Sequence, residues 1–152
     1  WCPAGNGDAL GALAGQSGAD VELSAAGGGA YLIRQQAWSN GQVEQYVTAV
    51  AAAVDACSGA SWTDGDGNTY TLEPLSSVPV IGDASISWTV TIELAGTPPT
   101  SSFAQQTVAR FGDVAMVLQA GATPTSGPDA AAPNYTVLVR AAADKVAGAV
   151  AG

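Results

Sequence analysis

Apolar and polar residues alternate along residues 84–94, which is the clearest pattern in the chain. One set of alternate positions holds Ile86, Trp88, Val90, Ile92 and Leu94, and the other holds Ser87, Thr89, Thr91 and Glu93. Successive side chains of a strand point to opposite faces of the sheet. The pattern therefore predicts a strand with one face in the core and the other in water.

Two segments show the helical period instead. Residues 40–57 follow a capping box of Ser39 and Gln42 and end before Gly59; their apolar stripe consists of Val43, Tyr46, Val47, Val50 and Val54. A second helix is predicted after Asn134 as N-cap, with a stripe made of Tyr135, Leu138, Val139, Ala142 and Val146. Each helix therefore has a single apolar face to bury.

Shorter apolar segments predict the other strands. These are residues 31–37, 60–63, 69–75, 102–110 and 114–119. Glycine and asparagine in residues 64–68 supply the backbone conformations of a hairpin loop, and Gly112 with Asp113 does the same for the last two strands. Gly82 and Asp83 have the character of turn residues before the central strand.

The order of these elements predicts an α+β fold. Short turns between the middle strands imply an antiparallel sheet of about five to six strands. The two helices are expected to pack on one face of that sheet in a two-layer arrangement, which leaves the other face polar. One domain is expected over residues 1–152, in which residues 1–29 form an irregular segment tied to the core, with a short helical turn capped by Asp8.

Charge and composition exclude several classes of function. Four lysines and arginines against thirteen acidic residues give a net charge of −9, which disfavours nucleic acid and anionic membrane surfaces as partners. The absence of histidine removes the commonest general base and most zinc and copper sites. We therefore expect no catalytic residues, no metal and no cofactor. No apolar run is long enough for a transmembrane segment, and Trp1 in place of an initiator methionine is typical of a processed chain.

The two cysteines, Cys2 and Cys57, bear on the compartment. A disulfide between them would tie down a glycine-rich terminal segment and would indicate an oxidising compartment. Two separate buried thiols are the alternative. An acylated lipoprotein cysteine is a third reading, but it would need a small residue where Trp1 stands.

Several short motifs resemble the PknH-like extracytoplasmic sensor domain family of actinobacterial lipoproteins and receptor-like kinases. The motifs are Arg-Gln-Gln at 34–36, Asp-Ala-Cys-Ser-Gly at 55–59, Pro-Val-Ile-Gly-Asp-Ala-Ser at 79–85, Val-Ala-Arg-Phe-Gly-Asp-Val at 108–114, and the closing alanine-rich helix. The resemblance implies an antiparallel sheet with flanking helices, a disulfide, a location outside the cytoplasmic membrane, and ligand binding without known chemistry. The kinase ectodomain carries more cysteines, which favours a free-standing lipoprotein or secreted relative.

Residues around the acidic hairpin form the candidate binding site. Asp64, Asp66 and Asn68 match the first ligands of a calcium loop, but Thr69 and Leu75 stand where its glycine and glutamate belong, so a plain hairpin is favoured. Trp88 is expected in the core and Trp38 at the edge of the packing. The ligand-binding residues are predicted to be Trp62, Tyr70, Asp64 and Asp66, which would meet the loop 120–133 at a sheet edge and favour neutral or cationic ligands.

Three functions remain open. The first is a noncatalytic sensor or ligand-binding module of the cell envelope, whose partner is a small molecule or a cell-wall component. The second is a structural or protein-interaction domain of a secreted protein or lipoprotein without a small-molecule site. The third is a secreted hydrolase that uses carboxylates alone, which would require two acids facing each other across a cleft. A concave apolar pocket would separate the first from the second.

Overall fold

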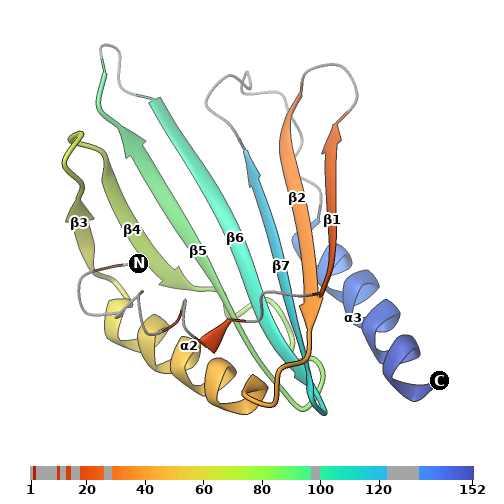
Figure 1. The fold of residues 1–152 in the computed structure, drawn as a ribbon. Helices are drawn as coiled ribbons and strands as arrows, with labels where there is room; N and C mark the ends of the chain where they lie inside the picture. The colour runs from red at the N-terminus through yellow and green to blue at the C-terminus, as the bar shows by residue number, and fades with distance from the viewer. Residues whose placement is uncertain are drawn as a thin grey trace.

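The computed structural model describes residues 2, 10, 13–14, 18–25, 29–96, 100–122 and 134–152, with side chains for all of these except 18–25, 29–31 and 122. The elements in chain order are β1 (Gly18–Ala25), β2 (Gly29–Trp38), α2 (Val43–Cys57), β3 (Ser61–Thr63), β4 (Thr69–Pro74), β5 (Ala84–Leu94), β6 (Thr100–Phe111), β7 (Val114–Ala122) and α3 (Tyr135–Ala151). Figure 1 shows them as one twisted sheet with two helices.

The sheet has seven strands in the order β1-β2-β7-β6-β5-β4-β3, and all neighbouring strands are antiparallel. The predicted α+β class with an antiparallel sheet is confirmed. The sheet has one strand more than the five to six that were expected. This additional strand is β1, which lies in the segment 1–29 that was predicted to be irregular. Its backbone pairs with the whole length of β2, from Gly18 opposite Trp38 to Ala25 opposite Gly29. An edge strand can be specified by its neighbour's free backbone groups, so its own apolar pattern is a weak signal.

Local signals placed most of the other boundaries correctly. The strand over residues 84–94 is observed with the predicted ends. Asn134 caps α3, and its side chain accepts a hydrogen bond from the backbone N–H of Val137. The capping box at the first helix is not formed: α2 begins at Val43, and the N–H of Gln42 donates to Oδ1 of Asn40 at 3.0 Å. The helical turn expected from Asp8 and most of the loop 120–133 lie outside the described residues.

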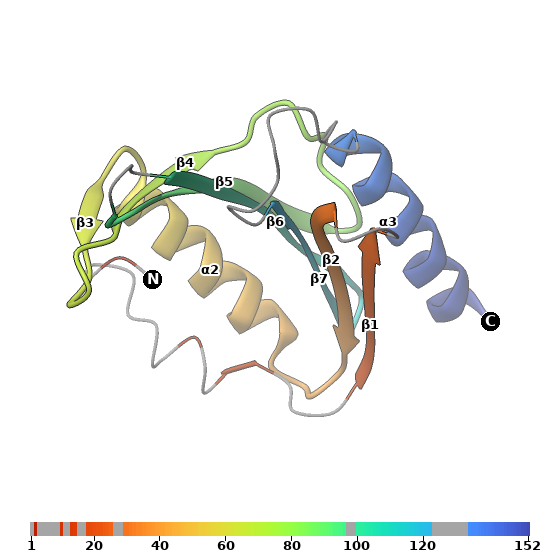
Figure 2. The same ribbon diagram turned by 90° about the horizontal axis from the view of Figure 1, so that it is seen from above.

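The two helices pack on opposite faces of the sheet, so the prediction that both lie on one face in two layers was wrong. Figure 2 shows α2 inside the concave side of the curved sheet and α3 on the outside. Adjacent residues of the central strands point to different helices: Val108 and Ala115 belong to the cluster around α2, whereas Ala109 and Met116 belong to the cluster around α3. Residues 108–109 of β6 and 115–118 of β7 place apolar side chains on both faces, so each helix buries its single apolar stripe against a surface of its own.

The face of β5 predicted to be polar is therefore partly covered. Thr107 of β6 is fully buried there, and its hydroxyl lies 2.8 Å from Ser87 Oγ and accepts from the Tyr135 hydroxyl at 3.0 Å. The same Tyr135 hydroxyl lies 3.2 Å from the carbonyl oxygen of Leu118. Burial raises the pKa of Tyr135 above its ordinary value. This hydrogen-bonded group joins α3 to three strands of the sheet.

Replacing Thr107 with valine tests that group. Thr107→Val keeps the shape but leaves the Ser87 and Tyr135 hydroxyls without their shared partner, so we expect the free energy of unfolding to fall by about 1–3 kcal/mol. Urea denaturation would measure the loss. Thr91→Val, the same change at an exposed position of β5, should have almost no effect. Equal stability of the two variants would contradict a structural role for the Thr107 hydroxyl.

A clamp formed by Gly82 and Asp83 holds the turn between β6 and β7. The Asp83 carboxylate accepts the N–H of Gly112 at 2.7 Å, and the Asp83 N–H donates to the carbonyl oxygen of Arg110 at 2.8 Å. Gly82 has a φ of 61°, and a Cβ at this position would overlap the same carbonyl oxygen. The predicted role of these residues in turns is confirmed.

The predicted disulfide joins Cys2 to Cys57, with their Cα atoms 5.9 Å apart. Cys57 is the last residue of α2 and is fully buried, and the next residues continue into a bridge between Ser58 and Leu72 of β4. Leu10 is buried in the cluster around α2. The disulfide therefore fixes Cys2 to the junction of α2 and the sheet.

Candidate functional site

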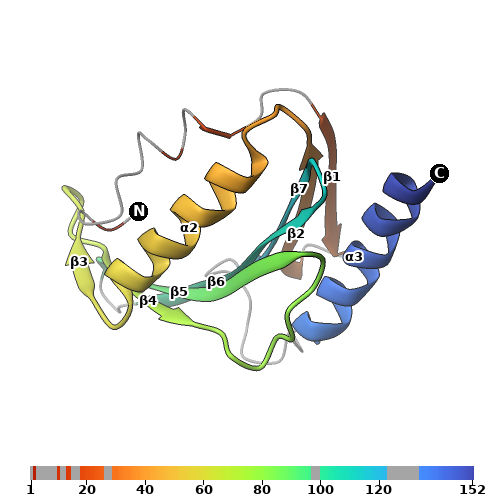
Figure 3. The same cartoon turned by 90° about the horizontal axis from the view of Figure 1, so that it is seen from below.

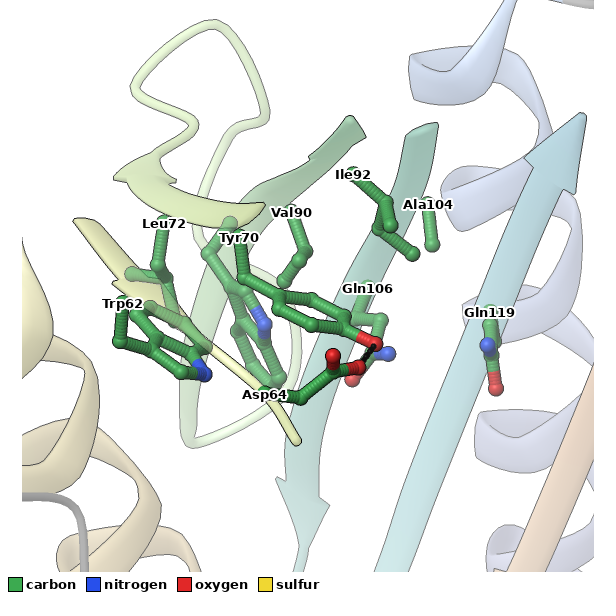
Figure 4. Close-up of a pocket in the computed structure, with 10 residues that line it drawn as sticks. Trp62, Asp64, Tyr70, Leu72, Val90, Ile92, Ala104, Gln106 and Gln119 are labelled. Carbon is green, nitrogen blue, oxygen red and sulfur yellow. Dashed lines mark hydrogen bonds between the residues drawn. The ribbon is translucent and has the colours of Figure 1, made fainter. Parts of the chain in front are cut away.

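A pocket of about 410 Å³ opens on the concave face of the sheet, beside α2. Its lining comes from five neighbouring strands and the β3–β4 hairpin: Trp62, Asp64, Tyr70, Leu72, Trp88, Val90, Ile92, Ala104, Gln106 and Gln119. Figure 4 shows these side chains converging from β3 and β4 on one side and from β6 and β7 on the other. Figure 3 shows the same concave side from below, with α2 lying across it.

Two stacked aromatic rings form one wall of the pocket. Trp62 of β3 and Tyr70 of β4 are directly opposite each other in the strand register. Their ring centroids are 5.7 Å apart and the ring planes differ by 12°. Both side chains are half-buried, and Trp62 also packs against the cluster around α2. Cross-strand aromatic pairs of this kind stiffen a short edge hairpin.

The acidic residue of the wall, Asp64, is held by four hydrogen bonds. Its Oδ1 accepts the N–H groups of Asp66 and Asn68, each at 2.9 Å, and its Oδ2 accepts from the Asn68 amide at 2.9 Å and the Tyr70 hydroxyl at 2.8 Å. The hydrogen bonds from Asn68 and Tyr70 lower the pKa of Asp64 to about 2. The bond to Asp64 raises the pKa of Tyr70. The carboxylate is therefore ionised at neutral pH, with its lone pairs already occupied.

These contacts favour the hairpin reading of residues 64–68 over the calcium loop. The Asp64 oxygens point at donors of their own loop, and Asp66 is exposed outside the pocket. Among the residues that the structure describes, no group of three acidic or sulfur side chains is arranged to hold a metal ion. Asp64 is also the one carboxylate among the described residues lining the pocket, whereas carboxylate hydrolysis needs a facing pair.

The floor of the pocket is set by strand register. Leu72, Val90, Ala104 and Gly121 are successive partners across β4, β5, β6 and β7. The neighbouring row holds Trp88, Gln106 and Gln119. Ala104 and Gly121 of the first row have small side chains or none, and the space above them is the part of the pocket next to the aromatic wall. Trp88 and Leu72, only 2% and 1% exposed, form the rigid part of the floor.

Three of the four predicted binding residues, Trp62, Asp64 and Tyr70, line this one pocket, and Asp66 does not. Trp88 is in the core, as predicted. Trp38 is buried at 7% exposure and meets the edge of the Tyr46 ring, with centroids 5.3 Å apart. The pocket extends inward from the sheet edge to β7, so it also includes Ala104, Gln106 and Gln119, which were not predicted.

The described helices include none that is long and apolar enough to cross a membrane. No family model matches the sequence, and no curated protein matches it. Among solved structures, the fold is similar to the extracellular domain of PknH from Mycobacterium tuberculosis, with a TM-score of 0.54 and 15% sequence identity. The match covers 84% of this chain and 62% of that one, so the chain spans less than two thirds of that structure. The chain therefore shares the fold of the PknH extracellular domain.

Proposed function

We propose that the protein is a noncatalytic sensor or ligand-binding module of the cell envelope, and that its ligand occupies the pocket on the concave face. The observation that carries the proposal is the pocket itself: it is concave, mostly apolar, and has a few convergent polar groups. Sites for small ligands have these properties and volumes of about 300–1,000 Å³. Trp62, Asp64 and Tyr70 are the predicted residues that contribute to it.

Two observations support a location outside the cytoplasm. The Cys2–Cys57 disulfide is a bond that persists in oxidising compartments. The fold is that of an extracellular domain. Both are compatible with a secreted protein and with one anchored on the outer side of the cytoplasmic membrane. The alternative, a structural or protein-interaction domain, would use an exposed surface and would leave the pocket without a ligand.

A neutral fluorescent probe tests whether the pocket binds ligands. We expect N-phenyl-naphthylamine to bind the protein at one site per chain, with increased emission. Trp62→Ala removes half of the aromatic wall, and Ala104→Leu fills the hollow of the floor, so each should weaken probe binding about tenfold or more. Fluorescence titration measures the affinity, and thermal unfolding should show midpoints close to that of the unaltered protein.

The matched control for the floor variant is Thr91→Leu. Thr91 is exposed on the other face of the neighbouring strand, so its replacement adds a similar apolar group outside the pocket. This variant should bind the probe normally. Unchanged binding by Ala104→Leu, or no binding by the unaltered protein, would refute the pocket as a ligand site. A large loss of stability in Trp62→Ala would place this residue in the core and remove it from the site.

A further inference from the structure

We infer that the pocket selects an uncharged amphiphile with a flat ring-bearing body and an amide or hydroxyl group at one end. This inference rests on the proposed function and adds the chemical class of the ligand. It follows from three separate properties of the lining: the position of its apolar surface, the position of its amides and the state of its one charge.

The apolar surface is continuous along one side of the pocket. The stacked rings of Trp62 and Tyr70 form the wall, and Val90 and Ile92 of β5 extend it toward Ala104. Figure 4 shows Tyr70, Val90, Ile92 and Ala104 around the same space. A wall of aromatic rings packs better against a planar ring than against a branched chain, because ring faces and edges pack closely against one another. This side would hold the body of the ligand.

Two glutamines of the lining occupy paired positions on β6 and β7. Gln106 of β6 and Gln119 of β7 are directly opposite in the register, so their Cβ atoms are close neighbours on the concave face. No hydrogen bond among the described residues engages either amide. Each amide offers two N–H donors and a carbonyl acceptor. Together they match a ligand group that both donates and accepts, such as an amide or a hydroxyl.

The charge of the pocket disfavours ionised ligands of either sign. An anion would face the ionised Asp64, and no lysine or arginine is present among the described lining residues. A cation would lose its water in a mostly apolar site while the Asp64 oxygens remain bound to Asp66, Asn68 and Tyr70. Burying a charge without a hydrogen-bonded partner is costly. A neutral group keeps the amide contacts without that cost.

Three probes with one ring system and different charges test the inference. Naphthaleneacetamide, naphthaleneacetate and naphthylethylammonium would compete with N-phenyl-naphthylamine at neutral pH. We expect the neutral amide to compete best, with the carboxylate and the ammonium compound at least about tenfold weaker. Equal or tighter competition by either ion would overturn the inference and leave the proposed binding function standing. Absence of binding by the fluorescent probe itself would instead refute the proposed function.

Two variants of adjacent glutamines locate the polar contact. Gln106→Leu removes an amide from the pocket, and Gln105→Leu makes the same change one residue earlier, on the other face of β6. The first should weaken naphthaleneacetamide about threefold to tenfold while leaving methylnaphthalene, which has no polar group, unchanged. The second should change neither. Equal weakening of both compounds by Gln106→Leu would show general damage to the site and would overturn the assigned hydrogen bond.

Discussion

Reduction of the Cys2–Cys57 disulfide is expected to lower the free energy of unfolding by about 4 kcal/mol. The bond links residues 55 positions apart, so it removes many conformations from the unfolded chain. The chain-entropy model gives a loss of that size for a loop of this length. The folded state should change less, because Cys57 stays buried at the end of α2 and the next residue, Ser58, forms the bridge to Leu72.

Urea denaturation with and without reductant measures this loss on an unaltered sequence. The intact mass should rise by two hydrogen atoms on reduction, and alkylation should label both cysteines only after it. The double variant Cys2→Ala with Cys57→Ala provides the control without reductant and should show a similar or larger loss. Two thiols that react freely in the untreated protein, or unchanged stability after reduction, would contradict the prediction.

Truncation of Trp88 is expected to cost about 3–5 kcal/mol, which is the range for large aromatic side chains removed from a packed core. Trp88 is 2% exposed at the centre of β5 and belongs to the cluster around α2. Because it also forms part of the pocket floor, Trp88→Ala should enlarge the pocket as well as destabilise the protein. Urea denaturation followed by circular dichroism would measure the loss.

Trp62→Ala is the matched comparison, because it makes the same substitution at a half-buried position of the edge strand β3. It should cost much less than Trp88→Ala. Trp88→Phe, which keeps most of the apolar volume, should recover part of the stability. Similar losses for the two tryptophan-to-alanine variants would mean that the edge hairpin contributes as much packing as the centre of the sheet.

The sequence predicted an element correctly where the pattern within that segment was sufficient to define it. The strand over residues 84–94 follows from its period of two, and the start of α3 follows from the Asn134 cap. The strand β1 was missed because its pairing depends on β2, which lies outside the segment itself. The prediction that α3 packs on the same face as α2 was wrong because the one-sided pattern of β5 does not extend to β6 and β7. Residues 108–109 of β6 and 114–118 of β7 are apolar at adjacent positions, a pattern typical of strands buried on both faces, as observed here.

The residues of the candidate site also differ in how far they could be predicted from the sequence. Trp62, Tyr70 and Asp64 are close in sequence, and the hairpin between β3 and β4 brings them together locally. Gln106 and Gln119 come from other strands, and their position depends on the register of β5, β6 and β7. Register across several strands is not encoded in any one segment, so the far side of the pocket could not be predicted.

The apolar residues on both faces of β6 and β7 near their shared turn also affect how the correct strand pairing is chosen during folding. In a sheet with one face in water, a strand that shifts its register by one residue exposes its apolar side chains to solvent. The free-energy cost of this exposure disfavours the shifted pairing. Here a slip would exchange Val108 with Ala109, or Ala115 with Met116, between two buried interfaces. We expect the clamp of Asp83 on the Gly112 turn to favour the native alignment, because it fixes the turn that joins the two strands. Asp83→Ala should accordingly yield a mixture of pairings, visible as doubled amide resonances for β7, rather than a uniformly weaker fold.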